Sequence, residues 1–452
     1  MAGVTLALWD EVLKTFYLPA VQEQLNNANV LSKFIQRNEE DVSGKNATIE
    51  CHYGRNTGSG SRPDNSVLPT AGYQQYKTAT IPMKYHYGRV QFTGPTIAAT
   101  RDERGSYARV VDTEIRGMVT DRMKEDNRML WGCGYGIVAR WETGAATTVR
   151  LQKAYRGNSV SYDGFGSAFG AKYLTENTSG TWCILTTSSP TTCTFATSTT
   201  DIAVTAITEY PTYDYCTVTN VDTPAAGTFV VRLGSIAAAQ TTTGLHRYEM
   251  MGLRGLVTNT DLDDIAIFAG AGTYSLGTTN NDPLQGLAVG TYSWWKSIVD
   301  THSSGRYLGQ RPLTFELMQR VFDKVESKAG KDYGPDMILT TAAIRREYLK
   351  LCESQRRMVN TMSLDGGFTA IDYNGVPFTI DDDAIDGEIY FLTLKDINLY
   401  RMSDYDWMNK DGAVLSRIST YDAYEAILFR YCELGIKRRN GQGVLCDIAY
   451  TN

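Results

Sequence analysis

Four histidines and eight cysteines are the residues best able to bind a metal ion, and they are scattered along the 452-residue chain. The cysteines form no CxxC pair, whereas a structural zinc site usually takes its ligands in closely spaced pairs. Cys51 and His52 are adjacent, but adjacent residues of a strand point to opposite faces of the sheet. We therefore expect no metal ion at these residues, and we predict buried, reduced thiols in a protein made in a cytoplasm.

Carboxylates could form a different kind of metal site, because hard cations prefer oxygen ligands. The two candidates are the run Asp381–Asp383 with nearby Asp386, and the pair Asp263–Asp264 near Asp261. The alternative interpretation is a solvated acidic turn, which in the first case follows a strand. We favour this alternative for both clusters and predict no bound cation.

Nucleotide binding and acyl transfer would require glycine-rich or serine-centred motifs. Gly132, Gly134 and Gly136 imitate the start of a dinucleotide-binding loop, but they follow a predicted helix and do not open one after a strand. A helix terminus explains these glycines better. No GxSxG elbow and no P-loop occurs in the sequence. We therefore expect no enzyme activity, no catalytic residue and no cofactor.

The composition excludes further classes of function. Lys and Arg number 44 against 50 Asp and Glu, so the net charge is -6 and no basic excess exists to neutralise nucleic-acid phosphates. Hydrophobic residues make up 42% of the chain, which excludes a disordered polyelectrolyte. No window approaches the ~20 apolar residues of a membrane span. Asp10, Glu11 and Lys14 interrupt the apolar N-terminal stretch, so we expect no secretory signal.

The N-terminal segment is predicted to form a helix over about Leu6–Leu18. Its apolar residues, which include Trp9 and Phe16, recur on one side of that helix. Pro19 interrupts the pattern, and a second short helix is expected to begin there. A segment this apolar needs a surface to pack on, either on its own subunit or on a neighbour.

Two predicted strands form an arm with a long tip. Residues alternate between apolar and polar over Ala47–Tyr53 and over Thr78–Tyr87, which is typical of half-exposed strands. Pro82 favours an edge position for the second strand. The 54–77 connection is rich in Gly and Pro and is longer than most loops of compact domains. Because an isolated hairpin has no core of its own, we expect this arm to rest on another molecule.

A long amphipathic helix follows the arm. Thr100 and Glu103 have the spacing of a capping box, and apolar residues recur from Tyr107 to Leu130 at three- and four-residue steps. The helix is predicted to end near Gly132. Its length suggests that it crosses a whole flattened subunit.

The composition changes between about residues 143 and 244. Residues 177–244 contain 20 Thr and only five charged residues, and short β-favouring runs alternate with Pro, Gly, Asn and Asp. We predict an inserted all-β module, a sandwich or small barrel. Its function is either that of an exposed platform on an assembly or only that of added contacts, and the sequence leaves both open.

The remainder of the chain mixes helices and strands, which indicates an α+β architecture. Thr314 is expected to cap a helix that stops before Gly330, and a second helix carries Ile344, Tyr348, Leu349 and Cys352. Predicted strands lie at Met337–Thr340, Gly375–Ile380, Glu388–Leu394, Ile397–Arg401 and around Ile427–Tyr431, and a turn at Arg439–Gly441 leads into Val444–Ile448.

The order of these parts resembles the major capsid protein of tailed bacteriophages, whose fold is named after phage Hong Kong 97. The segments that carry the resemblance are IPMKYHYGRVQFTGP, DERGSYARVVDTEIRGMVTDRMKEDNRMLWGCG, GPDMILTTAAIRREYLKL and NGVPFTIDDDAIDGEIYFLTLKDINLYR. They lie within residues 1–136 and 251–452, and the Thr-rich insertion departs from the minimal family pattern.

The resemblance implies a division of the chain into the parts of that α+β fold. These are an N-terminal arm (1–44), an extended hairpin loop (45–98), the spine helix of a peripheral domain (99–136), an inserted all-β domain (137–250), an axial domain (251–400) and C-terminal strands that return to the peripheral domain (401–452). In such a protein the hairpin tip around Arg55, Arg62 and Asp64 lies across a neighbouring subunit.

The resemblance also implies a function. The chain would assemble with copies of itself into pentamers and hexamers, and these would form an icosahedral or prolate head around double-stranded DNA without sequence-specific binding. Assembly would occur in the cytoplasm of a host bacterium, with the product in the virion. Scaffolding, portal and decoration proteins are further expected partners. A slightly acidic shell suits a container that does not cling to its DNA.

Candidate contacts between subunits follow from the same resemblance. They are Trp9 and Phe16 in the N-terminal arm, Arg55, Arg62 and Asp64 at the hairpin tip, and Lys77 and Lys84 in or beside the hairpin. Some family members join subunits by a Lys–Asn isopeptide bond, but neither lysine matches that pattern. Two alternatives stay open: an encapsulin-like shell around cargo enzymes, and a β-rich ligand-binding protein.

Overall fold

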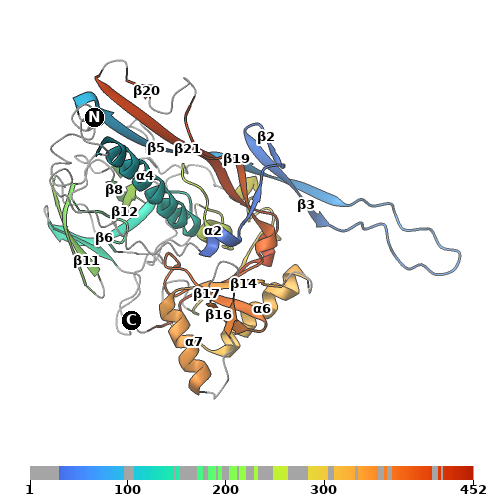
Figure 1. The fold of residues 1–452 in the computed structure, drawn as a ribbon. Coiled ribbons are helices and arrows are strands. Elements are labelled where there is room, and N and C mark those ends of the chain that lie inside the picture. The colour runs from blue at the N-terminus through green and yellow to red at the C-terminus, as the bar shows by residue number, and fades with distance from the viewer. Residues whose placement is uncertain are drawn as a thin grey trace.

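The computed structural model describes seventeen stretches of the chain. They are residues 30–95, 106–145, 148–152, 170–176, 182–189, 192–195, 203–210, 213–219, 229–232, 248–262, 283–303, 310–330, 334–354, 361–363, 369–409, 416–418 and 421–450. Three larger sheets, a projecting arm and one long helix make up most of the fold (Figure 1).

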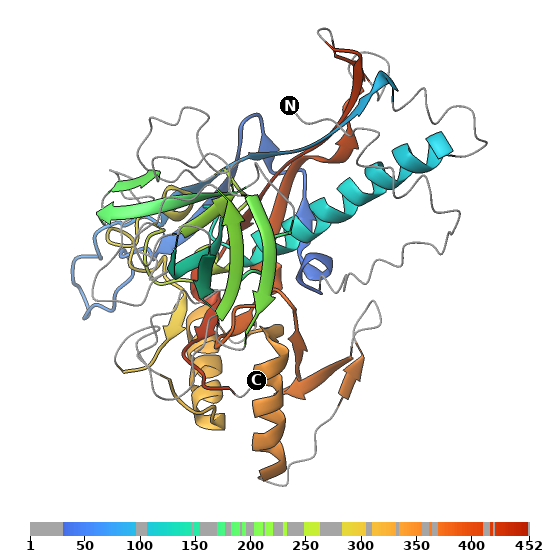
Figure 2. The same cartoon turned by 90° about the vertical axis from the view of Figure 1, so that its left-hand side faces the viewer.

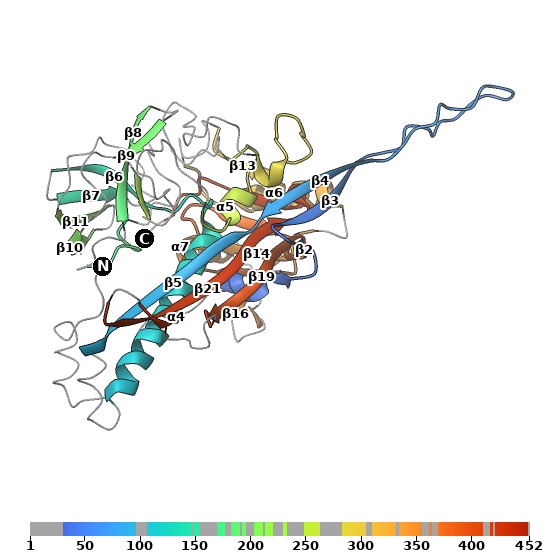
Figure 3. The same cartoon turned by 90° about the horizontal axis from the view of Figure 1, so that it is seen from above.

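The first large sheet lies beside the long helix α4 (Ser106–Trp131). Its order is β1 (Gln36–Asn38), β19 (Ile397–Trp407), β21 (Ala423–Ile436) and β20 (Ser416–Arg417), and β5 (Lys84–Thr93) also pairs with β21. Figure 3 shows β5, β21 and β19 side by side with α4 below them. Residues from opposite ends of the chain therefore form one layer.

The arm grows out of a three-stranded sheet of β2 (Val42–Ser43), β3 (Asn46–Gly54) and β4 (Gln75–Pro82). Its buried face carries Ala47, Ile49 and Ala79, which pack into the main core together with the short helix α2 (Val30–Phe34). Beyond Gly54 the connection runs far from the body of the molecule (Figures 1 and 3). The hairpin with a long tip is thus confirmed, and β4 is an edge strand, as Pro82 indicates.

The second large sheet is mixed and lies at the end of the molecule that also holds two helices (Figure 2). These helices are α6 (Phe315–Ala329) and α7 (Ala342–Ser354). The strand order is β13 (Ile298–Asp300), β22 (Gly443–Leu445), β18 (Ile389–Leu392), β14 (Met337–Thr340), β17 (Val376–Ile380), β16 (Thr369–Tyr373) and β15 (Thr361–Ser363). A separate apolar cluster of residues from α6, α7 and this sheet forms its core.

The third large sheet contains only strands from residues 137–232. Its order is β10 (Ala203–Glu209), β11 (Tyr213–Thr219), β7 (Thr148–Gln152), β6 (Ile137–Ala145), β12 (Phe229–Arg232), β8 (Trp182–Ser189) and β9 (Thr192–Phe195). Among the described strands, these seven pair only with one another. The prediction that this part of the chain is rich in β-strands is confirmed.

The predicted helix ends are also confirmed. The Thr314 side chain accepts a hydrogen bond from the Leu317 N–H at 3.2 Å and so caps α6, which ends at Gly330 with φ +97°. Helix α4 ends at Trp131, directly before Gly132. The predicted helix at residues 6–18 and the capping pair Thr100 and Glu103 lie outside the described residues.

The strand predicted over Thr78–Tyr87 is wrong in one respect, because it is two strands in two sheets. Ala79, Ile81 and Met83 are buried as expected, but β5 then buries His86 and exposes Tyr85 and Tyr87. The break lies at Met83, between Pro82 and Lys84, where the chain leaves β3 and joins β21. A shift of one residue at this break exchanges the two faces of the strand.

The boundary expected at residue 400 differs from the observed sheets as well. Residue 400 lies inside β19, and the whole strand belongs to the first sheet. Strand β21 pairs with β19 and β5 of the first sheet, whereas β22 pairs with β13 and β18 of the second. The last part of the chain therefore ties the two sheets together.

Candidate assembly surfaces and the ion network behind them

The arm exposes large apolar side chains at its tip. Val67 is 86% exposed and Leu68 is 81% exposed, and Tyr73 and Tyr76 on the returning segment are also largely exposed. A single exposed apolar side chain is ordinary, but such a group on a segment without a core marks an interaction surface. We call residues 55–74, which include Val67, Leu68 and Tyr73, the arm tip.

The predicted contact residues divide between the arm and the body. Arg55, Arg62 and Asp64 are exposed on the arm tip. The Lys77 ammonium lies 5.6 Å from the Tyr292 ring at the arm root, whereas Lys84 is half-buried at the start of β5. Trp9 and Phe16 lie outside the described residues.

A second exposed surface covers β5 and β21 and consists of aromatic side chains. Tyr85 and Tyr87 are 50% and 54% exposed and lie directly opposite Tyr431 and Phe429. The Tyr85 and Tyr431 rings are 5.2 Å apart in a T-shaped arrangement. We call these four residues the tyrosine face. The sequence did not reveal it, because the pattern placed Tyr85 and Tyr87 on the buried side.

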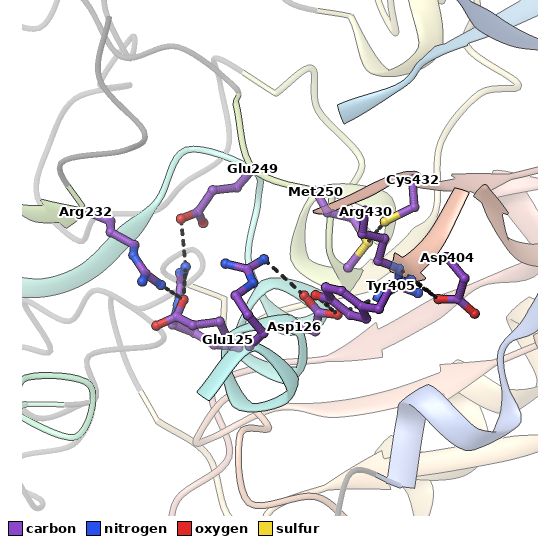
Figure 4. Close-up of polar contacts among 11 residues, drawn as sticks. Glu125, Asp126, Arg232, Glu249, Met250, Asp404, Tyr405, Arg430 and Cys432 are labelled. Carbon is purple, nitrogen blue, oxygen red and sulfur yellow. Dashed lines mark hydrogen bonds and ion pairs between the residues drawn. The ribbon is translucent and has the colours of Figure 1, made fainter. Parts of the chain in front are cut away.

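Four consecutive polar residues near the end of α4 connect the separate parts of the subunit. They are Glu125, Asp126, Asn127 and Arg128. Successive residues of a helix point about 100° apart, so four in a row face every direction around the axis. We call this set the α4 junction, and Figure 4 labels two of its members, Glu125 and Asp126.

Asp126 connects the helix to the first sheet. Its carboxylate accepts hydrogen bonds from Arg430 Nη1 of β21 at 2.5 Å and from the Tyr405 hydroxyl of β19 at 2.6 Å. Arg122, one turn earlier in α4, lies 3.4 Å away. Burial raises the pKa of Asp126, and the two arginines oppose that effect. Figure 4 shows Arg430 and Tyr405 reaching the helix from the sheet.

Glu125 and Arg128 connect the same helix to the third sheet and to residue 249. Arg128 pairs with Glu125 at 2.9 Å and with Glu249 at 2.7 Å, and Glu125 also pairs with Arg232 of β12. Burial acts to raise the pKa of Glu125, but Arg128 and Arg232 together hold it below its ordinary value. This carboxylate is therefore ionised at neutral pH and binds both arginines.

Asn127 connects the helix to the acidic turn after β17. Its amide donates to Asp381 at 3.2 Å and to Asp383 at 2.6 Å. Asp383 also accepts from Lys172 at 2.6 Å and from the Tyr173 hydroxyl at 2.8 Å. The turn is thus a meeting point of α4 with a segment of the 137–250 region.

The prediction of a solvated acidic turn after β17 is wrong for Asp381. Asp381 is only 1% exposed, and it accepts hydrogen bonds from the Asp383 N–H at 3.0 Å and from the Leu31 N–H at 3.5 Å. Burial raises the pKa of Asp381 to about 6. The expectation fails because Leu31 and α4 cover this turn, which its local sequence does not show.

His86 lies buried on the helix-facing side of β5, directly opposite Arg430 of β21. Burial, together with the Arg122 and Arg430 guanidinium groups, lowers the pKa of His86 to about 3. Its Nε2 atom has no hydrogen-bond partner among the described residues. A neutral imidazole fits this strongly cationic environment.

The described residues offer little sign of other chemistry. Within them, no three His, Cys, Asp or Glu side chains gather in a way that could hold a metal ion. No helix in the same part of the chain is long and apolar enough to cross a membrane. Six cysteines of the described stretches are buried and form no disulfide bond: Cys51, Cys133, Cys216, Cys352, Cys432 and Cys446.

Solved structures match this chain over nearly its whole length. A chain of the cyanophage A-1(L) capsid asymmetric unit matches with a TM-score of 0.54 at 12% identity, covering 98% of this chain and 99% of that one. The capsid of Myoviridae phage XM1 matches with a TM-score of 0.44 at 7% identity, covering 99% of each chain. The holo-SrpI encapsulin complex from Synechococcus elongatus PCC 7942 matches with a TM-score of 0.42 at 10% identity, covering 100% of this chain and 99% of that one.

No family model and no curated protein matches the sequence. The likeness to the cyanophage capsid chain has the highest TM-score of the three and shows that the two chains share an α+β fold.

Proposed function

We propose that this chain is the major capsid protein of a tailed bacteriophage, with the Hong Kong 97 fold. Copies of it would assemble into pentamers and hexamers that build an icosahedral or prolate head around double-stranded DNA. The observation that carries the proposal is the arm: a projecting hairpin with Val67 and Leu68 more than four-fifths exposed. The shared fold with a cyanophage capsid chain supports it.

The energetics of the arm tip favour a contact between copies. Burying an exposed Val or Leu side chain contributes about 1.5–3 kcal/mol. One contact of this size is weak, but a closed shell repeats it in every subunit. The tyrosine face on β5 and β21 is a second surface that a neighbouring copy would cover.

The described sheets support the assignment of the chain to the parts of that fold. Residues 1–44 would be the N-terminal arm, 45–98 the extended hairpin loop, and 99–136 the spine helix of the peripheral domain. Residues 137–250 would be an inserted domain, since the strands of 137–232 pair only among themselves in the described part. The axial domain would be 251–400, and 401–452 would return to the peripheral domain except for β22.

The charge of the chain suits the proposed contents of the shell. The net charge of -6 gives no general attraction to phosphates, so packed DNA would be enclosed without being held at specific sequences. Assembly would take place in the bacterial host cytoplasm and the product would be the virion, with scaffolding, portal and decoration proteins as further partners.

Purified protein tests this proposal directly. We expect electron microscopy and sedimentation to show capsomers, shells or tubes that form from a folded subunit. Treatment of particles with nuclease and analysis of their contents then distinguishes a DNA container from an encapsulin-like shell, which would hold a protein cargo. A monomer under all conditions that gains thermal stability from a small-molecule ligand would support a β-rich binding protein instead.

A further inference from the structure

We propose that Tyr53, Tyr292 and Trp294 fix the direction in which the arm leaves the subunit. We call these three residues the aromatic bracket. The inference rests on the proposed function, because the direction of the arm decides where it meets a neighbouring copy. Trp294 and Tyr292 would act as positioning residues and need not touch that neighbour.

The bracket holds the root of the arm on one side. The Tyr53 ring at the end of β3 stacks on Trp294 with a centroid distance of 5.3 Å and an interplanar angle of 6°. Tyr53 also meets the edge of Tyr292 at 6.4 Å, and Lys77 on β4 lies 5.6 Å from the Tyr292 ring. Both strands of the arm therefore contact Tyr292, and β3 also contacts Trp294, which resists both twisting and bending of the ribbon.

The opposite side of the ribbon is open. His52 and Tyr76 lie on that side with ring centroids 5.0 Å apart, and both are exposed. Because successive residues of a strand alternate between faces, Cys51 and Tyr53 point to the body and His52 points away. Only one face of the ribbon is thus anchored, and the anchor ends at Tyr53.

The body side of the bracket is itself held firmly. The Trp295 indole N–H donates to the Leu284 carbonyl at 3.3 Å, and the Asp261 carboxylate accepts from the Val289 N–H at 2.9 Å. The Gln285 amide is oriented so that it satisfies both backbone groups of Ile436. It donates to the Ile436 carbonyl at 2.9 Å and accepts from the Ile436 N–H at 2.7 Å. Residues 284–295 therefore form a platform that is tied to the end of β21.

The arm changes character at the bracket itself, at Tyr53. The regular pairing of β3 with β4 shifts between His52 and Gly54. A Cβ atom on Gly54 would lie only 2.7 Å from the Gln75 side chain, so this position is closely packed without a side chain of its own. An irregular ladder bends more easily than a regular one. We therefore place the pivot of the arm at Tyr53 and Gly54, where the ring contacts of the bracket act directly.

The test measures the arm on unassembled subunits, so it does not depend on whether shells form. Spin labels at Ser61→Cys on the arm tip and Lys328→Cys on α6 give a distance distribution by pulsed electron paramagnetic resonance. Both sites are exposed, and six native cysteines are buried. Cys183→Ser and Cys193→Ser are included in every variant, so that neither of these thiols takes a label. Trp294→Ala is expected to widen this distribution about twofold or more, since an aromatic pair gives a severalfold preference for the docked geometry. Trp294→Phe retains a ring and is expected to restore the narrow distribution.

Two further variants keep the test decisive. Tyr76→Ala removes a ring from the open face of the same ribbon and is expected to leave the distribution unchanged. If Trp294→Ala fails to fold, Tyr53→Ala removes the arm's half of the stack from a partly exposed position and is expected to widen the distribution in the same way. A folded Trp294→Ala or Tyr53→Ala subunit with an unchanged distribution would overturn the inference. Failure of the wild type to form shells would instead contradict the proposed function alone.

Discussion

Asp126 is the residue on which the α4 junction depends most. Its carboxylate is shared by two buried guanidinium groups and one hydroxyl, which come from α4, β21 and β19. A buried ion pair is not by itself strong evidence for stability, but removal of one partner leaves the other charge buried and unpaired. The junction therefore holds the long helix on the sheet mainly because separating these groups would leave a charge buried and unpaired. The net attraction between the charges contributes less.

Asp126→Ala should lower the free energy of unfolding by about 3–5 kcal/mol, because Arg430 loses its principal acceptor. Urea denaturation at neutral pH measures this change. Asp121→Ala is the matched control, since Asp121 lies on the same helix in an exposed pair with Lys124 at 3.8 Å, and it should cost about 0–1 kcal/mol. Equal losses for the two variants would contradict the role given to Asp126.

Asp381 should make the stability of the subunit depend on pH in a particular direction. Its pKa is raised from 3.8 to about 6, so the folded state holds the proton more tightly than the unfolded chain. Its favourable contribution is fully present below about pH 3.8 and is lost as the pH rises through about 6.

In the Asp381→Asn variant the side chain cannot ionise, so the variant does not lose this stability as the pH rises. Relative to the wild type, the variant should gain up to about 3 kcal/mol between pH 4 and pH 7. Urea titrations at several pH values measure the difference, and Asp382→Asn controls for the loss of one negative charge at an exposed neighbour. A difference that stays constant over this range would show that Asp381 is ionised throughout.

At the scale of elements, the arm tip depends on two glycines that face each other. A Cβ atom on Gly58 would lie 2.8 Å from the backbone nitrogen of Gly72, and one on Gly72 would lie 2.6 Å from Asn56 Oδ1. Real Cβ atoms do not approach backbone this closely, so the two sides of the loop would have to separate. The close approach of Gly58 and Gly72 therefore sets the conformation of the loop that exposes Val67 and Leu68.

Gly58→Ala should consequently disturb the arm and leave the body intact. We expect thermal unfolding within about 0.5 kcal/mol of the wild type, because the loop has no core, together with weaker assembly. Gly60→Ala is the control, since its Cβ would meet Pro69 at an ordinary 3.6 Å. Calorimetry and sedimentation measure the two effects, and normal assembly by Gly58→Ala would show that this close approach is unimportant.

The elements that the sequence predicted well are those with strong local signals. The Thr314 cap, the Gly330 terminus and the alternation over Ala47–Tyr53 each depend on residues close together in the chain, and the structure confirms all three. The break at Met83 was not predicted, because it arises where the chain exchanges β3 for β21 as a partner. No local pattern records which partner a strand will take.

The α4 junction was also not predicted, although the sequence contained a signal. Four polar residues in a row cover all sides of a helix, so at least one must face whatever packs against it. The apolar run Met129–Trp131 that follows shows that the helix end is buried on several sides. The partners Arg430, Glu249 and Asp381 are more than 100 residues away, and only the fold brings them together.

At the scale of the whole molecule, one helix end contacts all three large sheets. The first sheet is bound through Asp126, the third through Glu125 and the second through the turn that Asn127 contacts. One apolar cluster also contains residues of all three sheets, among them Cys432, Leu339 and Ile137, so the junction and this shared core together hold the sheets in one arrangement. A subunit of a shell needs this fixed arrangement, because neighbouring copies must meet at constant angles.

The arm tip should determine assembly without determining the fold of the subunit. Replacing Val67 and Leu68 together with Ser should leave the unfolding free energy within about 0.5 kcal/mol, because both side chains are already exposed. The concentration needed for assembly should rise at least about tenfold, since a contact of several kcal/mol is lost. Light scattering measures that concentration, and Ser66→Ala at an adjacent exposed position is the control. Assembly at the wild-type concentration would exclude these side chains from the contact.

The central claim is that this chain is the subunit of a shell and reaches its neighbour with the arm. Cryo-electron microscopy of particles formed by the purified protein tests it most directly. The claim predicts five- and six-membered rings in a closed shell, in which residues 55–74 of each copy lie on an adjacent copy. A protein that stays monomeric under all assembly conditions, or particles in which the arm folds back on its own subunit, would contradict it.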